Sequence, residues 1–91
     1  MRYAYQESFL QTTRRLSAHQ QARLLNAIEK FQRAIESGQW PQGLGFTHLR
    51  DDYFEFRVDL HTRVIYRRSP DLIAYLLYGS HDDIRRFLKA L

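Results

Sequence analysis

The fold is decided by three consecutive runs in the second half of the chain: Tyr53-Phe-Glu-Phe-Arg-Val-Asp59, Arg63-Val-Ile-Tyr-Arg-Arg68 and Leu72-Ile-Ala-Tyr-Leu-Leu-Tyr-Gly-Ser-His81. In the first run, the apolar side chains of Phe54, Phe56 and Val58 alternate with polar ones, and this period of two predicts a strand with one buried face. The third run is apolar throughout 72–78, as expected for a central strand covered on both faces. The runs therefore predict neighbouring strands of one sheet that displays arginines and histidines.

The breaks between these runs predict tight turns of an antiparallel sheet. Residues 60–62 form the predicted tip of the first hairpin. Residues 69–71, Ser-Pro-Asp, form the second turn, because proline presets the turn dihedral and aspartate bonds the local backbone. Two shorter strands are predicted at 1–7 and 46–50, and the residues 39–45 read as a linker before the second of them.

Helices are predicted on either side of these strands. A short helix is expected at 8–16, and Ser17 with Gln20 three positions later is a capping-box signature for a second helix. The second helix carries an apolar stripe at helical spacing, formed by Leu24, Ile28, Phe31 and Ile35. Gly38 suits the position just past its end, and the acidic pair 82–83 opens a last helix. The predicted fold class is α+β: an N-terminal strand and a helical hairpin packed on a mainly antiparallel sheet, with a short C-terminal helix.

Composition limits the class of protein. A chain of 91 residues is expected to be a single domain, 1–91, because either half alone is too small to bury a core. The absence of cysteine excludes disulfides, cysteine zinc sites and thiol nucleophiles. There is no apolar signal core and no apolar run of membrane-spanning length, so a cytoplasmic protein without membrane partners is expected. The net charge of +4 favours a polyanionic or acidic partner, although many small basic domains bind no anion.

Standard motifs for cofactors and metals are missing from the sequence. It has no phosphate-binding glycine loop, no paired-cysteine spacing and no His-Glu-x-x-His, so no metal and no small-molecule cofactor is expected. What remains is a set of cations and imidazoles on the predicted sheet: His48, Arg57, His61, Arg63, Arg67 and His81. Arginine forks match phosphate oxygens, and histidine transfers protons near neutral pH without a metal. The set therefore suits the binding and cleavage of a phosphodiester.

The register of the hairpin decides whether the arginines converge. With a three-residue loop at 60–62, Asp59 faces Arg63, and Arg57 shares a side with Arg63 and Arg67. A two-residue loop puts Arg57 and Arg63 on opposite sides. The sequence leaves both registers open. It also leaves open a plainer interpretation, in which Asp59 pairs with an arginine across the strands and Arg67 is solvated.

The order of elements and three motifs resemble the RelE/ParE toxin superfamily of bacterial toxin–antitoxin systems over nearly the whole chain. The motifs are Tyr53-Phe-Glu-Phe-Arg-Val58, Arg63-Val-Ile-Tyr66 and Gly79-Ser-His-Asp-Asp-Ile-Arg-Arg-Phe87. The resemblance implies an α+β toxin domain with a cognate antitoxin as partner. In the RelE branch it further implies an endoribonuclease that cleaves mRNA on the ribosome and so inhibits translation. That reaction uses the RNA 2′-hydroxyl as nucleophile, needs no metal and leaves a cyclic phosphate.

The resemblance also implies roles for particular residues. Arg63 matches the arginine of the Arg-x-x-Tyr strand, which clamps the phosphate and the transition state. His81 matches the proton-transfer histidine of the Gly-Thr/Ser-His segment in YafQ-like members. His48 resembles a histidine that precedes the hairpin there, and Arg57 stands where the family uses a basic or histidine side chain; both are candidate catalytic residues. RNA binding is expected from Arg57, Arg63, Arg67 and His61.

The chain departs from the family pattern at two positions. It has Phe87 where RelE has a tyrosine in its last segment, and His61 where YafQ-like members have an aspartate near the hairpin, so the sequence does not assign the general acid and base. Two other functions stay open: a ParE-like DNA gyrase inhibitor without nuclease activity, and a catalytically weak homologue that retains only antitoxin binding. The pairing of His81 with Arg63 favours the nuclease, because a pure inhibitor needs no titrating histidine beside a phosphate clamp.

Overall fold

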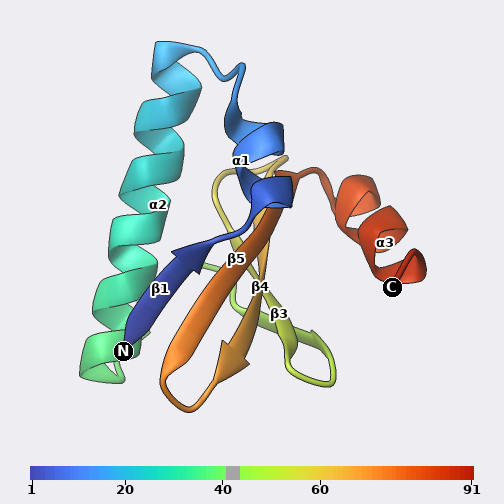
Figure 1. The fold of residues 1–91 in the computed structure, drawn as a ribbon. Helices are drawn as coiled ribbons and strands as arrows, with labels where there is room; N and C mark the ends of the chain where they lie inside the picture. Colours follow the sequence, from blue (N-terminus) through green and yellow to red (C-terminus); the bar gives the residue numbers. More distant parts are fainter. Residues whose placement is uncertain (41–43) are drawn as a thin grey trace.

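A five-stranded mixed sheet forms the centre of the protein, in a computed structural model that describes residues 1–40 and 44–91 (Figure 1). The strands are β1 (Arg2–Tyr5), β2 (Thr47–Arg50), β3 (Tyr53–Arg57), β4 (Arg63–Ser69) and β5 (Leu72–Gly79). They lie in the order β1-β5-β4-β3-β2. β1 runs parallel to β5, and the other neighbours are antiparallel, which confirms the mainly antiparallel sheet.

Three helices complete the α+β fold: α1 (Glu7–Thr13), α2 (Ala18–Ser37) and α3 (His81–Lys89). The predicted capping box at the start of α2 is confirmed, since the Ser17 side chain accepts the Gln20 N–H and the Gln20 side chain accepts the Ser17 N–H. Gly38 ends α2 at a φ of 74°, and its N–H donates to the Ala34 carbonyl. That left-handed conformation favours glycine because it carries no Cβ penalty.

The sheet is covered on both faces. α1 and α2 cover one face (Figure 1). Phe31 of α2 packs there among Phe56, Tyr66 and Tyr75 of the strands. α3 covers part of the other face and buries its Ile84 in a smaller core. The buried strand residues of this smaller core are Ile65, Ala74 and Leu76. Burial on both faces explains why the run 72–78 is almost wholly apolar.

A bulge in β5 adjusts its register with β4 near the end of the sheet where Arg63 lies. Ile65 pairs with Leu77 and Tyr66 pairs with Tyr75, so Leu76 is the additional residue. Beyond the bulge, Gly79 pairs with Arg63. The pairing brings the end of β5, and therefore the start of α3, beside the start of β4.

The predicted elements have their expected type, and several have shorter bounds. The first helix ends at Thr13 rather than at residue 16, and the strand that begins at Tyr53 ends at Arg57 rather than at residue 59. Positions 41–43 of the predicted linker lie outside the described residues. Across 1–40 and 44–91, no helix has the length and apolar character needed to cross a membrane.

Candidate functional site

Arg57 and Arg63 lie directly opposite each other on β3 and β4. This register differs from both predicted loops, because the chain between the paired arginines spans residues 58–62. Asp59 therefore does not face Arg63, which corrects the three-residue-loop prediction. Its consequence nevertheless holds: Arg57 and Arg63 share one side of the sheet, since residues paired across an antiparallel ladder point to the same face.

Asp59 instead organises the tip of the hairpin. Its Oδ1 accepts the backbone N–H groups of His61 and Thr62, both at 2.9 Å, and its Oδ2 lies 3.4 Å from Nη1 of Arg23 on α2. Burial opposes ionisation of the Asp59 carboxyl, but these hydrogen bonds outweigh it and lower its pKa. The predicted pairing of Asp59 with an arginine across the strands is wrong, because its arginine partner comes from α2.

The centre of the candidate site is a contact of three side chains: Glu55, Arg63 and His81. Nη1 of Arg63 donates to Oε2 of Glu55 at 2.7 Å and to Nδ1 of His81 at 3.2 Å. The Glu55 side chain is only 4% exposed, whereas the Arg63 side chain is 26% exposed. A buried carboxylate thus holds a partly accessible guanidinium, which in turn touches an exposed imidazole.

The contact determines the tautomer of His81. A guanidinium can only donate, so Nδ1 of His81 must be the acceptor and cannot carry a proton in this arrangement. Within this hydrogen bond, the ring proton of a neutral imidazole is assigned to Nε2. A neutral imidazole is the form that can take up a proton.

His81 owes its position to the start of α3. It is the first residue of the helix, directly after the N-cap Ser80, whose side chain accepts the Asp83 N–H at 3.1 Å. Oδ2 of Asp83 accepts the Ser80 N–H at 2.9 Å, and this hydrogen bond is the main reason that the pKa of Asp83 is lowered. A Cβ added at Gly79 would lie 2.8 Å from Cβ and Oδ2 of Asp83, so glycine is required for α3 to approach the sheet.

Arg57 lies beside this contact but is exposed. Its backbone N–H donates to the Leu44 carbonyl at 2.7 Å, and a Cβ at Gly45 would be 3.1 Å from its Cβ, so the chain before β2 packs closely against it. Within the described part of the chain, Arg57 forms no ion pair. Its charge is therefore available to an anionic ligand next to Arg63.

Arg67 lies apart from the cluster. It is four residues from Arg63 along β4, or about 13 Å at the usual strand rise. Its Nε and Nη2 both donate to Oδ2 of Asp52, at 3.1 and 2.9 Å, and its guanidinium lies 5.3 Å from the ring centre of Tyr53. The hydrogen bond from Arg67 lowers the pKa of Asp52. Arg67 can extend a basic surface, but the structure does not bring it to His81.

His48 and His61 lie outside the three-residue contact. His48 pairs with Phe54 and packs on its ring at 4.8 Å, and its Nε2 lies 2.7 Å from the Asp51 carbonyl oxygen. Phe54 belongs to the core under α1 and α2, so His48 is on the face of the sheet opposite to Arg63. His61 is exposed at the hairpin tip, on the rim of a hollow beside the site.

That hollow has a volume of about 730 Å³ and adjoins the cluster through the neighbours of Arg63 and His81 in sequence. It lies where the hairpin tip, the end of β5 and the start of α3 meet. Its lining residues are Thr12, Gln20, His61, Thr62, Leu77, Tyr78, Gly79, Ser80, Asp83, Arg86 and Phe87. A hollow lined by a phenyl ring, hydroxyl groups and a cation has the chemistry to bind a nucleotide next to Arg63.

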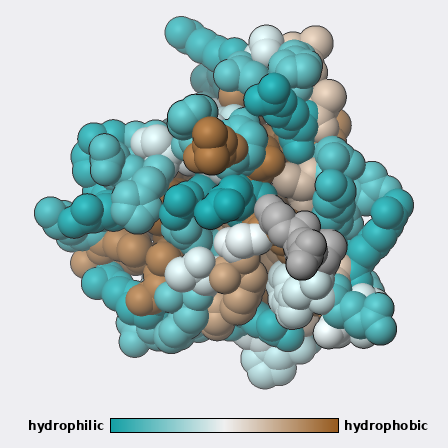
Figure 2. All heavy atoms as spheres, turned by 180° about the vertical axis from the view of Figure 1, so that it is seen from behind, coloured by the Kyte–Doolittle hydropathy of each residue, from teal (hydrophilic) through white to brown (hydrophobic). Residues whose placement is uncertain are grey.

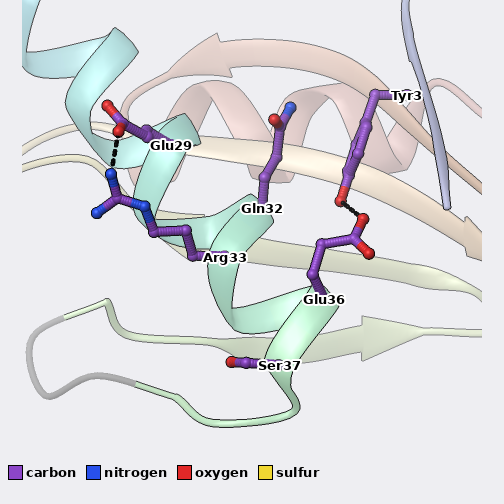
Figure 3. A pocket seen from close by; sticks show the side chains of 6 residues that line it. All are labelled: Tyr3, Glu29, Gln32, Arg33, Glu36 and Ser37. Carbon is purple, nitrogen blue, oxygen red and sulfur yellow. Dashed lines mark hydrogen bonds and ion pairs between the residues drawn. The ribbon is translucent and has the colours of Figure 1, made fainter.

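A second hollow, of about 640 Å³, lies between β1 and α2 (Figure 3). Its polar groups are paired with one another: the Tyr3 hydroxyl donates to Oε1 of Glu36 at 2.8 Å, and Arg33 forms an ion pair with Glu29. Burial, followed by the hydrogen bond to Glu36, raises the pKa of Tyr3 to about 12. This hollow holds no set of free cations, and it is far less suited to a phosphate than the Arg63 cluster.

Surface character agrees with a local polar site. Figure 2, which shows the side of the molecule opposite to that in Figure 1, has hydrophilic residues around separate hydrophobic patches. Among the described residues, no three His, Asp or Glu side chains gather closely enough to hold a metal ion.

Glu55 is the member of the site that the sequence prediction missed. Its position, two residues before Arg57 in an alternating strand, places it on the arginine side of the sheet. That signal was present in the sequence. Its burial was not, because burial depends on neighbours that only the folded chain brings together.

Comparison with known proteins gives the fold a wider context. No protein-family model matches the sequence, and no curated protein matches it. Among solved structures, the RelB-RelE antitoxin-toxin complex from Methanococcus jannaschii matches with a TM-score of 0.68 at 14% identity, over 92% of this chain and 96% of that chain. The E. coli DinJ-YafQ complex matches with a TM-score of 0.69 at 16% identity, over 92% and 98%.

A YoeB/ParE toxin from Agrobacterium tumefaciens also matches, with a TM-score of 0.61 at 18% identity, over 89% of this chain and 99% of that chain. The chain therefore has the fold shared by RelE, YafQ and YoeB/ParE toxins, and the predicted resemblance to the RelE/ParE superfamily is confirmed at the level of the fold.

Proposed function

We propose that this protein is the toxin of a type II toxin–antitoxin system and that it acts in the cytoplasm as a ribosome-dependent mRNA endonuclease. One observation carries the proposal: Nη1 of Arg63 lies 3.2 Å from Nδ1 of His81, on the side of the sheet that also displays Arg57. A phosphate clamp thus touches a proton-transfer group. The fold of toxins such as RelE and YafQ supports the proposal.

The proposed chemistry follows from these side chains. The guanidinium groups of Arg57 and Arg63 bind the scissile phosphate and stabilise the negative charge that grows on it. The RNA 2′-oxygen attacks the phosphorus, its proton passes to the neutral imidazole of His81, and the bond to the 5′-oxygen breaks. The 5′-oxygen leaves with a proton from solvent, and a 2′,3′-cyclic phosphate remains. His81 is exposed, so a rotation of its side chain can release Nδ1 from Arg63 to take up the proton.

Other residues have supporting parts in this proposal. His61, on the rim of the hollow, and Arg67, farther along β4, would contact RNA beyond the scissile phosphate. The sequence also suggested a catalytic part for His48, but the proposed reaction gives it none, because His48 lies on the other face of the sheet. Phe87 can offer a ring to a base but no hydroxyl group, so the reaction depends on His81 for proton transfer.

The proposed partner is a cognate antitoxin. Two of the structural neighbours are toxins in complex with an antitoxin, RelB-RelE and DinJ-YafQ. The net charge of +4 suits an acidic segment, and partly unfolded segments of that kind order themselves on binding. Such a segment would cover the cluster of Arg57, Arg63 and His81 and so prevent RNA binding.

Expression of the protein without an antitoxin tests the proposal. Translation is expected to stop, with cleaved mRNA ends on ribosomes and unchanged DNA topology. Cells that continue translation but accumulate gyrase-linked DNA breaks would instead support a gyrase inhibitor. Cells that show neither effect, while the protein binds an acidic antitoxin, would support the catalytically weak homologue.

A further inference from the structure

Glu55 is a charged side chain for which the chemistry above has no use. Its side chain is 4% exposed, and a carboxylate that is removed from water requires a charged or hydrogen-bonding partner. The structure supplies one in Nη1 of Arg63, at 2.7 Å. The same nitrogen donates to Nδ1 of His81. The buried Glu55 therefore contacts Arg63 directly and is linked to His81 through Arg63.

We propose that Glu55 is the positioning residue of this site, an inference that rests on the proposed nuclease function. It anchors one nitrogen of the Arg63 guanidinium and, through that nitrogen, sets the orientation and tautomer of His81. In the described part of the chain, Arg63 forms its side-chain hydrogen bonds through Nη1 alone. Nε and Nη2 therefore remain free for the two oxygens of a phosphate, in the fork geometry that arginine offers.

A second ion pair of β4, between Arg67 and Asp52 in the turn before β3, shows why Glu55 is more than a surface partner. Arg67 and Asp52 also form a close pair, but their side chains are 53% and 38% exposed. Water can replace either member of that pair at little cost. Glu55 has no such freedom, because it is almost fully covered. The buried Glu55 therefore holds Arg63 in one position, whereas the exposed Asp52 lets Arg67 move.

Glu55 has two separable effects on an anionic ligand. Its negative charge offsets that of Arg63 and weakens the attraction of a phosphate before reaction. Its fixed position keeps the Arg63 guanidinium in place and holds His81 beside it until the ring turns to take up the proton. Loss of the charge should therefore strengthen ground-state binding while it weakens catalysis. Replacement of a residue with a purely structural role would not strengthen phosphate binding while it weakens catalysis.

The first experiment measures His81 and phosphate binding by NMR in the full-length protein. The variants are Glu55→Gln, which removes the charge at constant size, and Glu55→Asp, which keeps the charge but withdraws it by one methylene. Asp71→Asn is the matched control, because it removes one negative charge from an exposed turn at the far end of β4. Amide spectra report whether each variant is folded.

In the wild type and in Asp71→Asn, the 15N signals of His81 should show one tautomer with the proton on Nε2. Glu55→Gln and Glu55→Asp should each show a mixture of both tautomers. Inorganic phosphate should bind about threefold more tightly to Glu55→Gln than to the wild type. Its affinity for Glu55→Asp should equal that for the wild type, because the charge is kept. An unchanged tautomer pattern in folded Glu55→Gln, or unchanged phosphate affinity in that variant, would overturn the proposal.

A second experiment separates this inference from the proposed function. With mRNA on ribosomes, Glu55→Gln should lower kcat by about 100-fold without raising KM, as expected for a misaligned site. A wild type that cleaves no mRNA would refute the nuclease function, while the NMR measurements would still decide whether Glu55 positions Arg63 and His81. A cleaving wild type with an equally active Glu55→Gln variant would refute the positioning role alone.

Discussion

Arg57 and Arg63 face each other directly across β3 and β4, so two like charges occupy one cross-strand pair. Such a pair is unfavourable for folding, and a protein that only needed stability would gain from replacing one of them. Its presence next to a histidine is more easily understood as a binding feature. Glu55 offsets the charge of Arg63, which leaves Arg57 as the free cation of the pair within the described residues.

Arg57→Gln should therefore stabilise the protein and weaken RNA binding together. Relief of the like-charge pair is expected to raise the free energy of unfolding by about 0.5 kcal/mol. Loss of one phosphate contact should reduce the salt dependence of RNA affinity by about one unit of slope. Urea denaturation and RNA titrations at several salt concentrations measure the two effects. A stabilised variant with unchanged RNA affinity would show that Arg57 does not belong to the RNA-binding surface.

Arg63→Ala should lose both cleavage and stability, because it leaves the buried carboxylate of Glu55 without its partner. We expect a loss of about 2 kcal/mol in the free energy of unfolding, below that for a fully buried pair since Arg63 is partly exposed. The double variant Glu55→Gln with Arg63→Gln removes both charges and should recover most of this loss. Denaturant unfolding of the three proteins gives the comparison, and a double variant no more stable than Arg63→Ala would contradict it.

His81→Gln should abolish most of the cleavage while the protein stays folded. The imidazole is exposed, so its replacement costs little stability, whereas the loss of a proton-transfer group lowers a rate by about 100-fold or more. His19→Gln, on the surface of α2, is the matched control. His48→Gln is the informative third variant: we expect a rate within about threefold of the wild type, since His48 lies on the other face. A large loss in His48→Gln would extend the active surface across both faces.

The burial of Tyr3 and its hydrogen bond to Glu36 predict a loss of stability at high pH. The pKa of Tyr3 is raised in the folded protein to about 12 from an ordinary value of 10.0, so the unfolded chain gives up this proton first. The stabilisation is complete below pH 10 and is lost as the pH rises towards 12. Denaturant unfolding between these values should show a shallower decline for Tyr3→Phe than for the wild type. Equal declines would exclude Tyr3 as a source of the loss. Buried Tyr66, whose pKa is also raised, contributes equally to both proteins.

Binding of an acidic antitoxin segment should depend on salt mainly through its association rate. Exposed charges are screened beyond about 10 Å at 0.1 M salt, whereas apolar contacts made on binding persist. Stopped-flow mixing at increasing salt should therefore slow association and leave the dissociation rate nearly constant. Complete dissociation at moderate salt would show that apolar contacts contribute little. An unchanged association rate would show that the charge of the sheet does not guide the partner.

The sequence by itself determined the α+β class and the helix boundaries that depend on local chemistry. The alternation in β3, the capping box of Ser17 and Gln20, and the glycine after α2 each involve neighbours within a few residues, so they can be recognised without the fold. It also determined the cations and histidines from which the site is built. These features depend on periodicity and on short-range hydrogen bonds, which a linear sequence contains directly.

Only the tertiary structure decided which of these residues meet. The register that sets Arg57 against Arg63 depends on the hydrogen bonds of Asp59 within the hairpin tip, and the nearness of His81 depends on the bulge in β5 and the start of α3. The burial of Glu55 depends on its tertiary neighbours, and the separation of His48 follows from its pairing with Phe54. Strand register and burial arise from contacts between separate elements, and for that physical reason the sequence left them open.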